Sequence, residues 1–406
     1  MENRRREIIE EIFKAVLLAA FLGGVVFFAS VFAFLGMLPL YGAVLVPVVG
    51  VAAIILIVIL ACRFSGPKLK RGALAVFSLI LAGSAVYGVW GWHDSGIAEL
   101  EERDNMLWKY GPFEEESLVA TLDEEADLKF SAQEAESLRL DGATALYPVY
   151  SAFVRATFPE GDYRVYDGTD DGYGQITCSG TTHAYQRLLE GRTDMIFVAG
   201  PSQEQLEMAE AAGMEYHLTP IGREAFVFFV NSKNQVEGLT VEQVQGIYSG
   251  EITNWKELGG KNQKIRPFQR AANSGSQTAL ERLMGDIPII EPEERDRIAG
   301  MGGIIREVAS YKNYDNAIGF SFRFYSTEMV KNGDIRLLAL DGVLPTKETI
   351  RDGSYPISNR FFAVTAAPVG EPAPEQTDDT IGAFLNWILS EEGQELIEKT
   401  GYVSLS

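Results

Sequence analysis

From residue 137 to the C-terminus, strand-like and helix-like segments alternate, and this alternation restricts the possible folds more than any other feature of the sequence. Short apolar runs at 138–140, 163–166 and 194–198 predict strands, and segments with helical spacing of apolar residues lie between them. Such alternation is typical of an open, mostly parallel α/β sheet covered by helices. The predicted helices lie at residues 148–158, 181–189, 203–212 and 381–398, and later strands at 225–230 and 360–365.

Two capping boxes mark helix starts within this pattern. Ser202 and Gln205 open the third predicted helix, and Thr240 and Gln243 open a further one. In a capping box the two side chains accept hydrogen bonds from backbone N–H groups that a helix start leaves without partners. The second box follows a new apolar strand, so a second α/β unit is expected to begin near residue 225.

Three loops share one pattern, in which an apolar run is followed by small and hydroxyl residues and then by an amphipathic helix. They lie at residues 141–145, 178–182 and 270–278. Small residues allow an oxyanion to approach the backbone closely, and N–H groups at a helix N-terminus point toward it. Arg270 adds a planar group that can hold two oxygens at once. Together the loops predict a tetrahedral anion held between helix ends, beyond the carboxyl ends of the strands.

The formal net charge of −21 is unevenly distributed. Residues 1–92 carry a net charge of +4, and the remainder carries −25. An acidic surface of this size repels nucleic-acid phosphates, so nucleic acid is excluded as a partner. A buried site for a small anion is still compatible with it, because local donors decide binding there. The two cysteines, Cys62 and Cys178, lie in different settings and argue against a disulfide framework.

The first 92 residues contain three apolar stretches without charges, at 15–38, 43–62 and 72–92. Each has about the ~20 residues that a helix needs to cross a bilayer, so they predict a three-span membrane anchor. Basic residues precede the first stretch and separate the second from the third, and acidic residues follow the third. This distribution predicts a multi-pass protein of the cell membrane with a cytoplasmic N-terminus, an acidic linker at 93–136 and an extracytoplasmic domain.

The sequence offers no credible catalytic or metal site. His93, His183 and His217 are scattered and lack metal-ligand spacing. Cys178 lies close to His183 in the sequence, but no third group that would orient such a pair is apparent. The chain is therefore expected to be neither an enzyme nor a metalloprotein, and to need no cofactor.

Five segments of the chain carry a resemblance to the extracytoplasmic phosphate-binding proteins of phosphate-specific ABC importers, in the periplasmic binding protein-like superfamily. The resemblance covers residues 138–406, and the motifs around Trp255 and near the C-terminus are the most specific. The segments are GATALYPVY at 142–150, IYSGEITNW at 247–255, RAANSGS at 270–276, AIGF at 317–320, and SEEGQ at 390–394 with TGYV at 400–403.

The resemblance implies a two-lobed α/β (Venus flytrap) fold over residues 137–406, here preceded by three transmembrane α-helices over 1–92. It implies a lobe one of residues 137–224 and 357–406 and a lobe two of residues 225–356. The family's anion contacts correspond to Thr144 and the backbone of Ala145, to Ser179 or Thr181, and to Arg270, Ser274, Gly275 and Ser276.

One position departs from the family. The family has an aspartate just after the strand at 194–198 that accepts the proton of hydrogen phosphate, and this chain has Ala199 and Gly200 there. Such a carboxylate would repel sulfate, which has no proton to share. Asp141, next to the first loop, is the replacement that the sequence suggests. Phosphate and another tetrahedral oxyanion therefore both stay open as ligands.

The resemblance implies a membrane-tethered solute-binding protein that captures inorganic phosphate for an ABC permease. An anion-sensing receptor of the same fold, which signals through a membrane partner, is the alternative. An enzyme acting on phosphate esters is the third class, and a turnover assay separates it from the other two.

Overall fold

A computed structural model of the chain describes residues 40–61, 66–95, 107–163, 174–292, 314–330 and 334–405, together with residues 297–298 and a few isolated positions before residue 40. The chain divides into two compact units, Met1–Ala98 and Glu99–Ser406.

The N-terminal unit contains two long helices, α2 (Leu40–Ala61) and α3 (Pro67–Ser95). They cover the second and third predicted apolar stretches, whereas most of the first stretch lies outside the described residues. Helix α3 begins five residues before the predicted stretch and so includes Lys68, Lys70 and Arg71. In the described part of the chain, no helix is long and apolar enough to span a bilayer. The predicted three-span anchor is therefore not supported.

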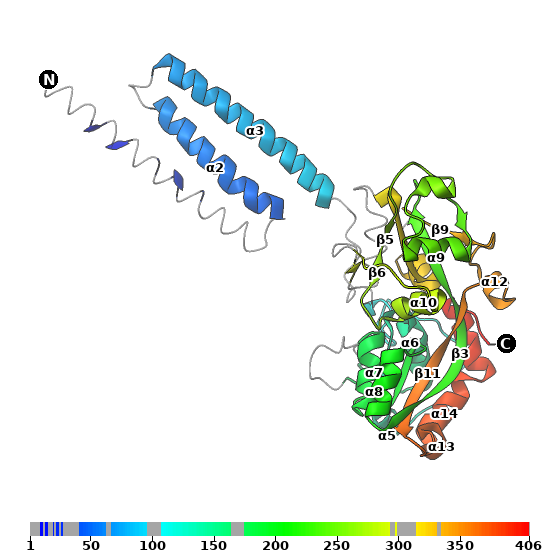
Figure 1. The fold of residues 1–406 in the computed structure, drawn as a ribbon. Helices are drawn as coiled ribbons and strands as arrows, with labels where there is room; N and C mark the ends of the chain where they lie inside the picture. The colour runs from blue at the N-terminus through cyan, green and yellow to red at the C-terminus, as the bar shows by residue number, and fades with distance from the viewer. Residues whose placement is uncertain are drawn as a thin grey trace. The chain divides into compact units, whose positions relative to one another are not determined.

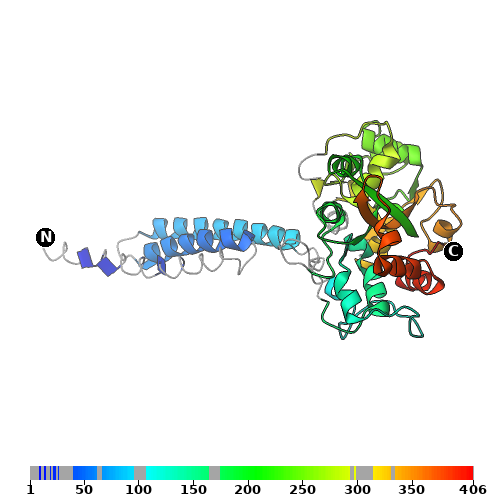
Figure 2. The ribbon, with the colours of Figure 1, turned by 90° about the horizontal axis from the view of Figure 1, so that it is seen from below.

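The C-terminal unit is organised by two long strands, β3 (Met214–Asn231) and β11 (Ser358–Pro368), which pair antiparallel along most of their length. Figures 1 and 2 show that these strands run through both halves of the unit. On one side β11 pairs with β2 (Met195–Ala199), and β2 pairs in parallel with β1 (Leu140–Gly142). The other side of the sheet contains β8 (Ala317–Phe322), β5 (Arg266–Pro267) and β9 (Ile335–Leu337).

The sheet is thus mixed rather than mostly parallel as predicted, because the two long strands connect the halves in opposite directions. Both strands are longer than their predicted apolar cores, since each continues past its buried part. Short paired strands accompany the main sheet: β4 (Gly238–Leu239) with β10 (Ala339–Leu340), and β6 (Gln269–Arg270) with β7 (Arg297–Ile298).

Two large hydrophobic clusters lie on the two sides of the strands β3 and β11 that connect the halves, and this gives the two-lobed architecture. Phe153, Phe197 and Phe384 belong to the cluster of lobe one, and Phe228 and Trp255 to the cluster of lobe two. The helices of lobe one are α5 (Ala132–Ser137), α6 (Tyr147–Thr157), α7 (Thr181–Leu189), α8 (Gln203–Ala211), α13 (Pro374–Thr377), α14 (Asp379–Ile388) and α15 (Glu391–Thr400); those of lobe two include α9 (Val241–Ser249), α10 (Gly275–Met284) and α12 (Lys347–Arg351).

Both predicted capping boxes are confirmed at the starts of α8 and α9. Two other details differ from the sequence expectations, and one further prediction stays untested. The first strand begins at Leu140 because Leu138 caps α5. The helix predicted at 381–398 is divided at Ser390, the N-cap of α15. The strand predicted at 163–166 lies almost entirely outside the described residues.

The acidic segment predicted as a linker belongs in part to lobe one. Leu107, Tyr110, Val119 and Phe130 are buried in the lobe-one cluster. Apolar side chains spaced widely among acidic residues are sufficient to hold the segment against the lobe, because each reaches the same core.

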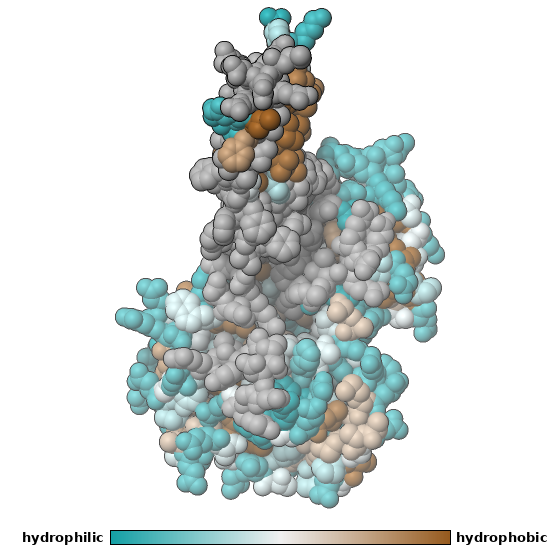
Figure 3. All heavy atoms as spheres, turned by 90° about the vertical axis from the view of Figure 1, so that its left-hand side faces the viewer, coloured by the Kyte–Doolittle hydropathy of each residue, from teal (hydrophilic) through white to brown (hydrophobic). Residues whose placement is uncertain are grey.

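In the N-terminal unit, Figure 3 shows many hydrophobic side chains at the surface of the described helices.

Candidate anion-binding site

The first loop connects β1 to α6 through a short 3-10 helix, η2 (Thr144–Leu146). Thr144 and Ala145 are buried in this turn, 8% and 3% exposed. Gly142 permits the close approach of two backbones, because a Cβ there would lie 2.6 Å from the carbonyl oxygen of Phe197. The Gly142 N–H donates to Asp141 Oδ1 and the Ala143 N–H to the Phe197 carbonyl (2.9 Å), so the N–H groups that this loop can offer an anion are those of Thr144 and Ala145.

The second loop is joined to the first by hydrogen bonds. The Gly180 N–H donates to the Gly142 carbonyl (3.1 Å), and the Ser179 N–H donates to Asp141 Oδ1 (2.9 Å). Helix α7 starts at Thr181, and its N-cap Gly180 (φ 85°) supplies no side-chain cap. Because no side chain occupies this helix end, its first N–H groups are available to a ligand.

Asp141 lies at the centre of this joint. It has no exposed surface, and its two oxygens accept four hydrogen bonds: from the N–H groups of Gly142 and Ser179, from Ser179 Oγ (2.7 Å) and from Arg187 Nε (2.9 Å). Burial raises the pKa of this carboxyl, whereas the bonds from Ser179 and Gly142 and the charge of Arg187 act in the opposite direction. Four bonds use the whole acceptor capacity of a carboxylate.

This geometry does not favour Asp141 as the acceptor of a phosphate proton, because no lone pair is left for a ligand. It also separates the two candidates in the second loop. The Ser179 hydroxyl donates its proton to Asp141, so it has none to give an oxyanion. Thr181 is the better placed hydroxyl of the pair, because its Oγ1 faces Gly275 at the start of α10 in the other lobe.

The third loop begins at Arg270 in β6 and ends at Ser274, the N-cap of α10. Arg270 is 9% exposed, and Ser276 in the first turn is 1% exposed. Ser274 Oγ accepts from the Gln277 N–H, which leaves its own O–H free to donate. The buried hydroxyl oxygens of Ser276 and Thr278 have no hydrogen-bond partner within the described residues.

The helix ends of the two lobes face each other directly. A Cβ placed on Gly275 would lie 3.0 Å from Thr181 Oγ1 and 3.6 Å from the Cβ of Ala199. Figure 1 shows α10 at the boundary with α6 and α7. The structure thus brings the start of α10 against the start of α7, next to Ala199.

Beneath these loops lies a cavity of about 20 Å³ that reaches the long connecting strands. Ala145, Thr181 and Ala199 line it together with Glu224 and Tyr402, whose hydroxyl donates to the carbonyl of Ala145. Glu224 is a functional candidate that sequence reasoning missed. Its only signal in the sequence is an acidic residue directly before the apolar run Ala225–Val230.

Glu224 is 4% exposed and lies on β3 where the lobes join. Its oxygens accept from the N–H groups of Ala225 (2.8 Å) and Phe324 (3.1 Å), and Arg323 Nε lies 3.8 Å away. Burial raises the pKa of Glu224 from 4.5 to about 7, against the lowering effects of Arg323 and, more weakly, Lys347.

Glu224→Gln is expected to change how stability depends on pH. In the unfolded chain the carboxyl ionises near pH 4.5, and in the folded protein near pH 7, so the folded state binds the extra proton between these values. The wild-type protein therefore loses stability as pH rises through this window, by about 3 kcal/mol. Relative to wild type, the variant should gain that amount between pH 4.5 and pH 8 in urea unfolding.

Glu215→Gln, on the same strand with a side chain 44% exposed, is the matched control for Glu224→Gln. Its effect on the free energy of unfolding should be smaller than that of Glu224→Gln, because its side chain is partly exposed. A Glu224→Gln variant whose difference from wild type stayed the same from pH 4.5 to pH 8 would show that Glu224 does not titrate in this window.

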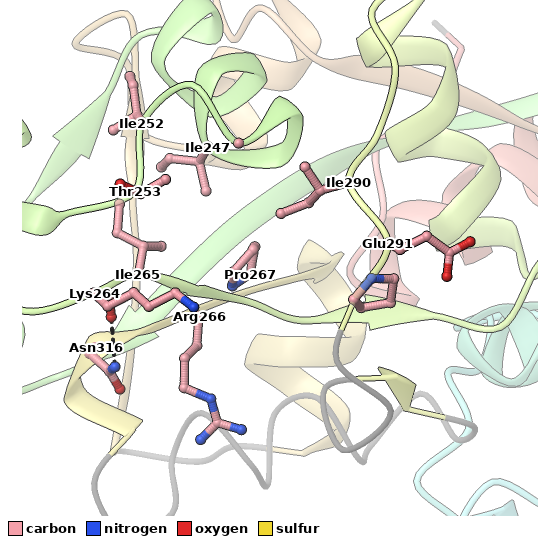
Figure 4. A pocket seen from close by; sticks show the side chains of 12 residues that line it. Ile247, Ile252, Thr253, Lys264, Ile265, Arg266, Pro267, Ile290, Glu291 and Asn316 are labelled. Atoms are coloured by element: carbon pink, nitrogen blue, oxygen red, sulfur yellow. Dashed lines mark hydrogen bonds between the residues drawn. The ribbon is translucent and has the colours of Figure 1, made fainter.

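A larger pocket of about 350 Å³ lies within lobe two, away from the three loops. Figure 4 shows Ile247, Ile252 and Ile290 on its walls, with the guanidinium of Arg266 directed away from them. Lys264 and Arg266 also line the pocket, but the carboxylate of Glu291 shares it and opposes an anion. Size alone therefore does not identify the site. Within the described residues, no three His, Cys, Asp or Glu side chains are grouped to hold a metal ion.

The chain is similar to several known proteins. A family model described as a PBP superfamily domain matches residues 130–392. The chain is similar to the phosphate-binding protein PstS of Staphylococcus epidermidis (27% identical over 232 residues, 56% of this chain and 68% of the relative). It is also similar to PstS of Pseudomonas aeruginosa (27% over 253 residues, 57% and 74%). A putative phosphate ABC transporter substrate-binding protein from Clostridium perfringens, solved with bound phosphate, covers 66% of this chain at 24% identity with a TM-score of 0.49, and 99% of its own chain is matched.

Proposed function

The chain belongs to the PBP superfamily, and we propose that its C-terminal unit is an extracytoplasmic solute-binding domain that captures inorganic phosphate and delivers it to an ABC permease. The relatives named above are phosphate-binding proteins, which supports phosphate as the ligand. The domain binds and releases its ligand unchanged, so it is not an enzyme under this proposal.

One observation carries the proposal: helix starts from both lobes meet, with a buried arginine at the head of one loop. The contact of Gly275 with Thr181 brings the start of α10 to the start of α7. Arg270 supplies a cation in a region of low exposure, where its interaction with an anion is strong. The buried hydroxyl of Ser276 adds a donor that suits a ligand with several oxygens.

We assign the anion contacts by the kind of donor. Backbone N–H groups come from Ala145 and Gly275, and the guanidinium comes from Arg270. Hydroxyl donors come from Thr144, Thr181, Ser274 and Ser276. Ser179 and Asp141 are left out of this set because they bond to each other and hold the first two loops together.

Calorimetric titration of the full chain tests the function. Phosphate should bind saturably with one site per chain, and arsenate, which has the same shape and protonation, should compete with it. Sulfate and molybdate, titrated in parallel, decide the ligand class. If sulfate binds as tightly as phosphate, the proposed ligand class changes from phosphate to fully ionised oxyanions. An absence of binding by all four anions would refute the proposal.

A further inference from the structure

Asn273 is a lobe-two residue that contacts lobe one. It lies in the third loop, between Arg270 and the N-cap Ser274, with φ of 62°. This left-handed conformation is uncommon for residues other than glycine, and asparagine is among those that adopt it most readily. The conformation turns both the side chain and the carbonyl of Asn273 toward the other lobe.

The side chain of Asn273 bonds to the start of α8. Its Oδ1 accepts from Ser202 Oγ (2.9 Å), and its Nδ2 donates to Glu204 Oε2 (2.7 Å). Ser202 is 4% exposed, so one of these two bonds is shielded from water. Shielded hydrogen bonds are the ones that contribute most to stability.

The backbone carbonyl of Asn273 bonds to α7 and α8 as well. It accepts from Thr182 Oγ1 (3.0 Å) and from Gln205 Nε2 (3.3 Å). One further contact crosses between the lobes from α10, where Arg282 Nη2 donates to the Pro201 carbonyl (2.6 Å). A single residue of the third loop therefore holds the starts of two lobe-one helices.

We propose that Asn273 is an interlobe latch that couples closure of the lobes to anion binding. The inference rests on the proposed function. The anion is expected at Thr181 and at Ser274, which adjoin Thr182 and Asn273 in the chain. An anion that orders the third loop against α7 therefore also brings Asn273 to its partners. The latch bonds in turn oppose opening, so the latch acts as a positioning element that slows ligand release.

Asn273→Gly removes the side-chain bonds and keeps the positive φ and the carbonyl. We expect the full-chain variant to release phosphate about 10-fold faster, with a similar loss of affinity, because two hydrogen bonds are lost. Stopped-flow dissociation and calorimetry with inorganic phosphate measure both. Ala272→Gly, at the exposed neighbouring position, is the control for added loop flexibility and should release phosphate at the wild-type rate.

A second pair of variants tests the latch from lobe one. Thr182→Val removes one donor to the Asn273 carbonyl and should speed release about 3-fold, whereas Thr182→Ser keeps the hydroxyl and should match wild type. A role of Thr182 in helix packing alone would not distinguish valine from serine in this way. Wild-type release rates in both Asn273→Gly and Thr182→Val would overturn the proposal.

Closure is also measured without any ligand. Spin labels on two introduced cysteines, Glu210→Cys in α8 and Asp286→Cys after α10, report the distance between the lobes. Both positions are exposed, and Cys62→Ser removes a native thiol from the background. Asn273→Gly should shift the distance distribution toward longer values, and an unchanged distribution would refute the latch. If the wild-type chain binds no phosphate but the variant still opens, the proposed function fails and the latch stands.

Discussion

Arg270→Ala is expected to weaken phosphate binding by roughly 30-fold or more. Arg270 is 9% exposed, and under the proposed function its guanidinium contacts the anion. Truncating one partner of a buried, hydrogen-bonded charge pair typically costs about 2–5 kcal/mol, which corresponds to this loss or a greater one. Calorimetric titration of the full chain with phosphate measures the effect.

Two variants make this result specific to Arg270. Arg270→Lys keeps the charge but not the planar fork, so binding should be intermediate. Arg266→Ala removes an arginine of the same lobe that lines the separate pocket of lobe two, and binding should stay at the wild-type level. Phosphate affinity of Arg270→Ala within about threefold of wild type would show that the third loop is not part of the site.

Asp141→Asn should produce the largest change in stability. The substitution leaves Arg187, whose side chain is 5% exposed, without its buried counter-ion at 2.9 Å. It also replaces one acceptor oxygen by an amide that cannot accept from Ser179 or Arg187. Breaking a buried ion pair from one side costs about 3–5 kcal/mol, and urea unfolding should show a loss of this size.

Binding by the Asp141→Asn variant distinguishes the two roles considered for this residue. If Asp141 serves to join the first two loops, its loss disturbs the site for every oxyanion. Phosphate and sulfate should then both bind more weakly, and the ratio of their affinities should not change. A ratio that moves toward sulfate would instead restore Asp141 as the acceptor of the phosphate proton. Asp194→Asn, in the partly exposed pair with Arg139, is the control and should cost less stability with little effect on binding.

Features with local causes were predictable from the sequence. The capping boxes of α8 and α9 depend on residues three positions apart, and both formed as predicted. The three loops were recognisable because small residues and hydroxyls before a helix serve the same backbone groups in any fold. The two-lobed α/β architecture followed from the motifs of lobe two and the C-terminus, and the match to residues 130–392 supports it.

Features that depend on distant partners were not predictable in the same way. Asp141 looked like a ligand because it adjoins a loop in sequence, yet Ser179 and Arg187, 38 and 46 residues later, occupy its oxygens. The acidic segment before residue 137 looked like a linker until its few apolar residues were seen to share the lobe-one core. The single predicted helix near the C-terminus is two helices, because Ser390 starts a new one.

The sequence by itself therefore determined which groups are available: helix starts with free N–H groups, hydroxyls beside them and one arginine at the head of a loop. These are properties of short segments, and neighbouring residues decide them. Only the tertiary structure decided which of those groups remain free for a ligand, because each competing partner comes from a distant part of the chain. Asp141 and Ser179 are used up in joining two loops, Glu224 is placed under the site by the long connecting strand, and Asn273 is hydrogen-bonded to the other lobe.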